Sequence, residues 1–287
     1  MGEDWSRWLD EAPVAGDSVS QSVRSEAPVA RLRGDDNGSG GQRSILVVGG
    51  CGGAGTTTTV LGIAGEFAGE GRPTVAVDAT SAGSDLALRG ADEHLHPVSL
   101  QSWLYGRGDD EPAPLRECLS RATSGIGLLW RDAEPLRRRA TYLTVARAVR
   151  DAGYTAVYDG GHPIAARQLL PLLADADVAL VLAIPARNDA ANRLRVALEW
   201  LDDQFGDPVD RRGGGIVGEV TIVVSHQYPD QDIRVAEHLR EHLSGWVRDI
   251  EEIPYDSHLA RGELVRHASL APETRRAYRR LLTGVAS

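Results

Sequence analysis

Lysine is absent from this chain, and all 31 of its basic residues are arginine. A GC-rich genome, which favours arginine codons, explains the bias. Its chemical consequence does not depend on that cause. No ammonium side chain of this protein can bind a phosphate group, so a phosphate site in it must work without one.

Other scarcities narrow the class of protein. Cys51 and Cys118 are the only cysteines, too few for a disulfide framework and without metal-ligand spacing. No apolar run reaches the length of a membrane span. The net charge of −10 argues against a general electrostatic grip on nucleic acid. Residues 1–10 are acidic and unlike a signal peptide. We expect a cytoplasmic protein that meets membranes only indirectly.

Residues 1–42 differ in composition from the rest of the chain, being rich in Ser, Gly, Asp and Pro. Such a segment buries too little apolar surface to offset its ordering entropy, which predicts a disordered acidic tail. Glu-Ala-Pro-Val-Ala occurs in it twice, and Trp5, Trp8 and Leu9 share one face of a short helix. We favour chance hydrophobes in a low-complexity tail; the alternative is a motif that docks on a partner.

Residues 43–287 alternate between apolar strand patterns and amphipathic helix patterns. The patterns predict strands at residues 44–48, 74–77, 126–130, 155–158, 178–184 and 220–224. They predict helices at residues 57–69, 141–152, 186–203, 233–243 and 272–282. Such alternation indicates an α/β domain with a three-layer, mostly parallel, doubly wound sheet. Ligands of such domains bind at the carboxyl ends of the strands.

A glycine-rich loop joins the first predicted strand to the first predicted helix. Five of the seven residues 49–55 are glycine. Glycine lets the backbone approach oxygen atoms closely, and a helix N-terminus presents free N–H groups to an anion. The loop therefore predicts a phosphate site, for which two arrangements compete.

In the first arrangement, Gly50, Gly52 and Gly55 form the G-x-G-x-x-G pattern of dinucleotide-binding proteins. Asp78 then ends the second strand, where an acid that binds the ribose belongs. A dinucleotide-dependent oxidoreductase usually adds a catalytic Tyr/Lys or Cys/His set further along the chain, and none is evident here.

In the second arrangement, Gly50 and Gly55 are the glycines of a phosphate-binding P-loop, G-x-x-x-x-G-K-[ST]. Thr56 then occupies the lysine position and Thr57 the position of the magnesium ligand. The loop alone does not choose between the two. A hydrophobic strand that ends in Asp159 favours the P-loop, because P-loop proteins place a second acid near the magnesium ion.

Five segments in the same order resemble the MinD/ParA group of deviant P-loop ATPases, over nearly all of residues 43–287. They are the loop at residues 45–58, the strand that ends at Asp78, Tyr158-Asp159-Gly-Gly, residues 176–185 and residues 252–262. Within the group the chain looks most like the CpaE/TadZ-like septum-site-determining branch, which shares the Gly-Gly-Ala-Gly loop and a Gly-Glu-Leu stretch near residue 262.

The resemblance implies a site for ATP or ADP with Mg²⁺. It assigns nucleotide binding to Gly50, Gly52, Gly53, Ala54, Gly55, Thr56, Thr57, Thr58, Asp78, Asp159 and Pro254. Mg²⁺ would be held by Thr57, Asp78 and Asp159.

Four positions depart from the family pattern. Thr56 replaces the lysine that binds the β- and γ-phosphates, and Cys51 replaces the lysine that reaches the partner's nucleotide. Thr80 replaces the aspartate that positions the attacking water. Phosphoryl transfer needs positioning and charge neutralisation, so we expect weak nucleotide binding and no catalytic residue of the family's route. The adenine-reading asparagine is replaced by Ser225 or His226.

These departures predict a degenerate P-loop protein that acts as a scaffold in a positioning, division or secretion/pilus system. The resemblance implies a homodimer, recruited by a partner to a pole, septum or membrane. The alternatives are an ATPase activated by a partner's arginine, and a dinucleotide-binding oxidoreductase. We interpret Cys51 as a small space-filling residue rather than a redox group, His226 and His267 as surface histidines, and the last helix as packed on the sheet.

Overall fold

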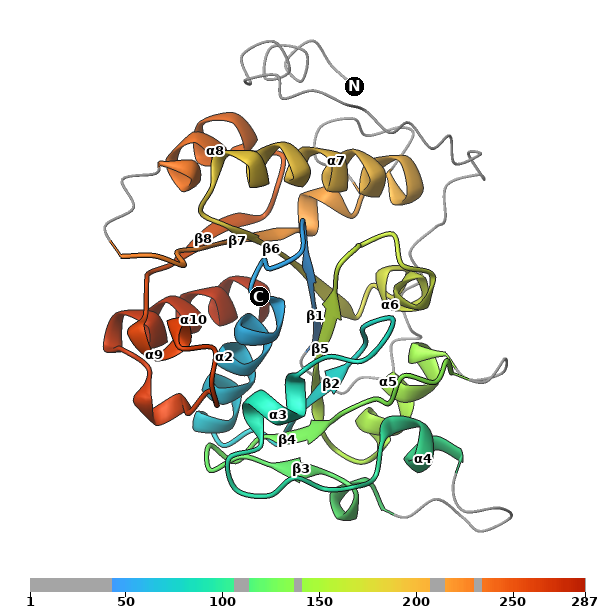
Figure 1. Cartoon of the computed structure of the whole chain (residues 1–287). Coiled ribbons are helices and arrows are strands. Elements are labelled where there is room, and N and C mark those ends of the chain that lie inside the picture. Colours follow the sequence, from blue (N-terminus) through green and yellow to red (C-terminus); the bar gives the residue numbers. More distant parts are fainter. Residues whose placement is uncertain (1–42, 106–113, 137–140, 207–214, 230–233, 287) are drawn as a thin grey trace.

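A computed structural model describes residues 43–105, 114–136, 141–206, 215–229 and 234–286 (Figure 1). The tail predicted for residues 1–42, with Trp5, Trp8 and Leu9, lies outside these ranges and remains a prediction. Among the helices that the structure describes, none has the length and apolar character needed to cross a membrane.

Within the described residues, eight strands form one sheet in the order β3-β4-β2-β5-β1-β6-β7-β8. Only β3 runs antiparallel to its neighbour. The strands are β1 (Ser44–Gly49), β2 (Thr74–Asp78), β3 (Ser120–Arg121), β4 (Gly127–Leu129), β5 (Thr155–Gly161), β6 (Val178–Pro185), β7 (Thr221–Ser225) and β8 (Asp249–Ile253). The chain builds one half of the sheet from β1 to β5 and then crosses β1 to build the other half. Both halves therefore meet at β1, where the glycine-rich loop leaves the sheet.

Helices cover both faces of the sheet. The α-helices are α2 (Thr56–Gly69), α3 (Leu86–Gly90), α4 (Leu100–Tyr105), α5 (Tyr142–Asp151), α6 (Leu170–Leu173), α7 (Asn188–Phe205), α8 (Val235–Leu243), α9 (Ser257–Ala260) and α10 (Pro272–Ala286). Figure 1 shows α2 and α10 on one face and α5 to α8 on the other. The three-layer, mostly parallel α/β fold predicted from the sequence is thus confirmed.

The last helix packs against α2 and β8, as expected, and is four residues longer than predicted. Its buried side chains include Tyr278, Leu281 and Val285. Tyr278 is fully enclosed because α2 presents Gly62 to it: a Cβ atom at Gly62 would lie 2.3 Å from the tyrosine ring. Glycine at this point lets the two helices approach closely.

A buried carboxylate also joins α2 to the C-terminal part of the chain. Glu66, 4% exposed, contacts His267 Nε2 at 2.9 Å, Arg279 Nε at 2.8 Å and Arg275 Nε at 3.4 Å. The interpretation of His267 as a surface histidine is therefore wrong. Burial lowers the pKa of His267, although the charge of Glu66 and the hydrogen bond to it work to raise this pKa.

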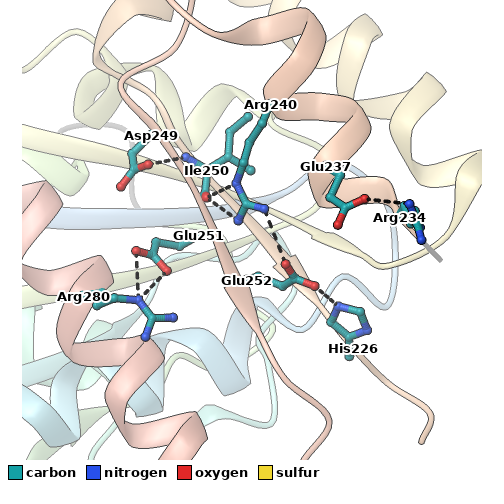
Figure 2. A network of polar contacts seen from close by, with 9 residues as sticks. All are labelled: His226, Arg234, Glu237, Arg240, Asp249, Ile250, Glu251, Glu252 and Arg280. Carbon is teal, nitrogen blue, oxygen red and sulfur yellow. Dashed lines mark hydrogen bonds and ion pairs between the residues drawn. The ribbon is translucent and has the colours of Figure 1, made fainter. Parts of the chain in front are cut away.

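The hydrophobic pattern did not predict β8, for a reason visible in its contacts. Neighbouring side chains of a strand point to opposite faces. Glu251 pairs with Arg280 of α10, whereas Glu252 pairs with Arg240 of α8, as Figure 2 shows. The acids that hide the strand in the sequence are neutralised by helices on the two faces of the sheet.

Candidate functional site

The backbone of the loop between β1 and α2 depends on its glycines. Gly55, directly before α2, has φ of 84°, in the left-handed region that glycine adopts without steric cost. A Cβ atom at Gly50 would lie 2.9 Å from Cγ2 of Ile184 on β6. The loop thus passes close to the sheet and turns sharply into the helix, which leaves the first N–H groups of α2 facing outward.

A cavity of about 510 Å³ opens at this loop, at the carboxyl ends of the strands. It is lined by Gly53, Ala54, Gly55, Thr56, Thr57 and Thr58 of the loop and by Cys51, Arg89, Ser225, His226, Gln227, Tyr228, Ile253, Pro254, Asp256, Leu259, Ala260 and Gly262. The structure therefore brings most of the predicted nucleotide-binding residues to one cavity. Gly50, Gly52, Asp78 and Asp159 are not among its lining residues.

Asp159 and Asp78 lie side by side beneath the loop, at matching positions of β5 and β2, and neither is exposed. Thr57 Oγ1 donates a hydrogen bond of 2.6 Å to Asp159 Oδ2. Burial and the charge of Asp78 raise the pKa of Asp159 to about 6, although the Thr57 hydroxyl works against the shift. A hydroxyl and a carboxylate in contact are the oxygen ligands that suit Mg²⁺.

Asp78 is occupied by its own loop instead. Its Oδ1 accepts hydrogen bonds from the Thr80 amide at 3.0 Å and the Thr80 hydroxyl at 2.7 Å. Its Oδ2 accepts from the Ser84 amide at 2.6 Å. The carboxylate that the sequence assigned to the magnesium ion therefore orders residues 78–84, and only Asp159 contacts the predicted threonine ligand.

The wall opposite the loop is the turn that follows β7. His226 Nε2 and Glu252 Oε1 are 2.6 Å apart, and Arg240 lies 3.6 Å from the other oxygen of Glu252 (Figure 2). Gln227 Nε2 donates to Gly53 O at 2.6 Å, which ties this wall to the glycine loop. Only 12% of the His226 side chain is exposed, so its interpretation as a surface histidine is wrong.

Cys51 lines the cavity but has little thiolate character. Cys51 is 5% exposed, and burial raises the pKa of its thiol in spite of the nearby charges of Arg187 and Arg193. A reactive cysteine needs a lowered pKa. Its environment supports the space-filling interpretation.

Arg89 is a cavity residue that the sequence did not reveal. It lies on the five-residue helix α3, too short to show a periodic pattern, and in no recognised motif. Its Nη1 donates to Thr58 Oγ1 at 3.2 Å, which brings a guanidinium group next to the start of α2.

Several solved structures share this architecture. A ParA family ATPase from Chlorobium tepidum is 14% identical, with a TM-score of 0.64 over 85% of this chain and 99% of that one. MinD from Pyrococcus horikoshii, complexed with Mg-ADP, is 17% identical, with a TM-score of 0.58 over 85% and 95%. The MinC:MinD complex of Aquifex aeolicus gives 16% identity and a TM-score of 0.54 over 84% and 96%.

No protein-family model matches the chain, and no curated protein sequence does. At these identities the structural likeness establishes the fold alone. The oxidoreductase alternative is not favoured, because the fold matches that of ParA and MinD P-loop proteins. The chain has the P-loop fold of ParA and MinD proteins, and its cavity opens at the glycine-rich loop between β1 and α2.

Proposed function

We propose that this protein is a nucleotide-binding scaffold: it holds ATP or ADP with Mg²⁺ in the loop cavity and hydrolyses it negligibly. The proposal depends on one contrast within the site. The hydrogen bond between Thr57 and Asp159, the two residues expected to bind Mg²⁺, is present. The positions for the phosphate-binding lysine and the water-positioning aspartate hold Thr56 and Thr80, and the Thr80 hydroxyl is bound to Asp78.

The two losses affect different steps of the reaction. A threonine at the lysine position offers a hydroxyl without charge, which weakens both ground-state binding and stabilisation of the transition state. Loss of the water-positioning acid lowers the rate alone. Binding therefore persists where turnover does not, which suits a protein that acts by assembling with others.

Our proposal for the partners of this protein is based on the similar solved structures and not on the cavity. The MinC:MinD complex pairs this fold with a protein of a cell-division system. We propose that the present chain likewise works as a homodimer with proteins of a positioning, division or secretion/pilus system, in the manner of the CpaE/TadZ-like branch. Recruitment by those partners would bring it from the cytoplasm to a pole, septum or membrane.

Calorimetry and phosphate release on the full chain test the proposal. We expect Mg-ATP and Mg-ADP to bind, with raised thermal stability, and NAD(H) or FAD to leave it unchanged. A ligand at ten times its Kd stabilises the folded state by about 1.4 kcal/mol. Turnover comparable to that of active relatives, abolished by Thr57→Ala or Asp159→Ala, would overturn the scaffold proposal.

The second candidate is an ATPase that a partner activates, and the retained Thr57–Asp159 pair favours it. It differs in one measurable respect: phosphate release must rise when the partner is added, and an arginine of that partner must be required. Absence of nucleotide binding by the folded protein removes both candidates.

A further inference from the structure

Arg89 is a partly buried cation that has no acidic partner among the described residues. Its Nε atom is buried and makes no hydrogen bond. In the part of the chain that the structure describes, no carboxylate lies within salt-bridge distance of its guanidinium. A buried charge without a counterion is costly, and such groups are normally paired. Among the described residues, the side chain of Arg89 hydrogen-bonds only to the neutral hydroxyl of Thr58.

The helix that carries Arg89 is fixed in place, so the position of its side chain is not a matter of a loose surface loop. The Arg89 carbonyl accepts a hydrogen bond of 2.7 Å from the Val265 amide. A Cβ atom at the following Gly90 would lie 2.4 Å from Leu128 and 2.6 Å from Leu61. Leu86, one turn earlier on α3, is fully buried. The backbone that holds the guanidinium is therefore packed against α2 and the sheet.

The cavity that Arg89 lines offers a second source of positive potential. The amino end of α2, with 14 residues, opens on the same cavity, and its first N–H groups have no partner within the helix. A planar guanidinium beside free N–H groups suits the oxygen atoms of a phosphate, which can accept two hydrogen bonds from one arginine.

We propose that Arg89 is the phosphate-binding cation of this cavity and supplies, from α3, the charge that the loop lacks at Thr56. The inference rests on the proposed nucleotide-binding function and names the residue on which the affinity depends. It also explains how a chain without lysine keeps a phosphate site: the charge comes from outside the loop. Arg89 adjoins Thr58 and not the Thr57–Asp159 contact. Arg89 therefore contributes to phosphate binding but does not replace the lost water-positioning acid.

Binding of adenosine, AMP, ADP and inorganic pyrophosphate to the full chain, with Mg²⁺, tests the proposal. Arg89→Gln removes the charge and keeps most of the side-chain length. We expect it to weaken ADP and pyrophosphate by about tenfold or more, as for a lost hydrogen bond between charged groups. Adenosine should bind as before, and Arg89→Lys should recover part of the affinity. Arg116→Gln changes the net charge equally at an exposed site outside the cavity and should have no effect.

The possible outcomes distinguish failure of the Arg89 proposal from failure of the nucleotide-binding function. Unchanged ADP affinity in Arg89→Gln overturns the role of Arg89 and leaves the nucleotide function standing. Pyrophosphate binding that requires Arg89, without any binding of nucleosides or nucleotides, supports the phosphate site and overturns the nucleotide function. If the folded protein binds none of the four ligands, both proposals fall. Circular dichroism and thermal unfolding of each variant exclude misfolding as the cause.

Discussion

The carboxylate of Asp159, on β5, is fully buried. Burial and the negative charge of the neighbouring Asp78 both disfavour its ionised form. The pKa of Asp159 in the folded protein, about 6, lies above the value of 3.8 for an unshifted carboxyl. Between pH 4 and 6 the folded state therefore binds more protons than the unfolded state. The free energy of unfolding must fall as the pH rises through this window and then level off.

Asp159→Asn should remove this penalty, because the amide is a neutral mimic of the protonated acid. We expect the variant to be more stable at pH 7 by up to about 3 kcal/mol and to lose the pH dependence between 4 and 6. Urea denaturation at several pH values measures both effects. Asp203→Asn, at an exposed position on α7, serves as the control. A variant less stable than the wild type at pH 7 contradicts the assignment.

Substitution of Thr56 by lysine would restore the positive charge that the loop lacks. Thr56→Lys should tighten ATP binding by about tenfold, the effect of a charged hydrogen bond, while phosphate release stays low because Thr80 is unchanged. Thr56→Gln adds length without charge and should leave the affinity near that of the wild type. Calorimetry with ATP distinguishes the two. A large rise in turnover in Thr56→Lys would show that Thr80 is not limiting.

At the scale of helices, the close approach of α2 and α10 depends on Gly62. Gly62→Ala places a methyl group against the ring of Tyr278, in a contact that neither helix can relieve without moving. We expect a loss of about 1–3 kcal/mol of stability, measured by thermal or urea unfolding. Gly69→Ala, near the end of the same helix, meets no atom within 4 Å and should be neutral or stabilising. Equal effects of the two substitutions would refute the packing argument.

The elements that the sequence predicted and those that it did not differ in what holds them in place. The strands β1, β5 and β6 each contain an apolar run covered on both faces, so their hydrophobicity makes them recognisable in the sequence. By contrast, β8 carries acidic residues that pair with arginines of α8 and α10, so in the sequence it looks like a surface loop. The arginines that pair with these acids lie far away in the sequence, so the local hydrophobic pattern does not predict this strand.

The same reason separates the predicted from the unpredicted part of the site. Residues 53–58 follow one another along the chain and carry their own glycine signature, so the loop was recognisable. Arg89 and Gln227 join the cavity from distant segments through α3 and the turn after β7. The occupation of Asp78 by Thr80 and Ser84 depends on the conformation of one loop. Contacts of this kind exist only once the chain has folded.

At the scale of the whole molecule, the sequence predicts that residues 1–42 contribute nothing to the core of the domain. Deletion of these residues should leave the melting temperature within about 1 °C, because surface changes outside the core cost little. Thermal unfolding and circular dichroism of residues 43–287 measure this. We expect localisation or partner capture to change instead, as seen by fluorescence imaging of tagged full-length and shortened chains. Failure of the shortened chain to fold in soluble form contradicts the prediction.

The walls of the cavity come from both ends of the domain, which bears on how the protein is made. The glycine loop lies near residue 50, whereas Pro254, Leu259 and Gly262 complete the opposite side. Tyr278 of α10 packs against Gly62 of α2. During synthesis on the ribosome, the loop emerges long before these residues exist. The growing chain must therefore carry an incomplete cavity through most of translation, and a ligand that contacts all of its walls could stabilise the fold only after residues 254–262 have been added.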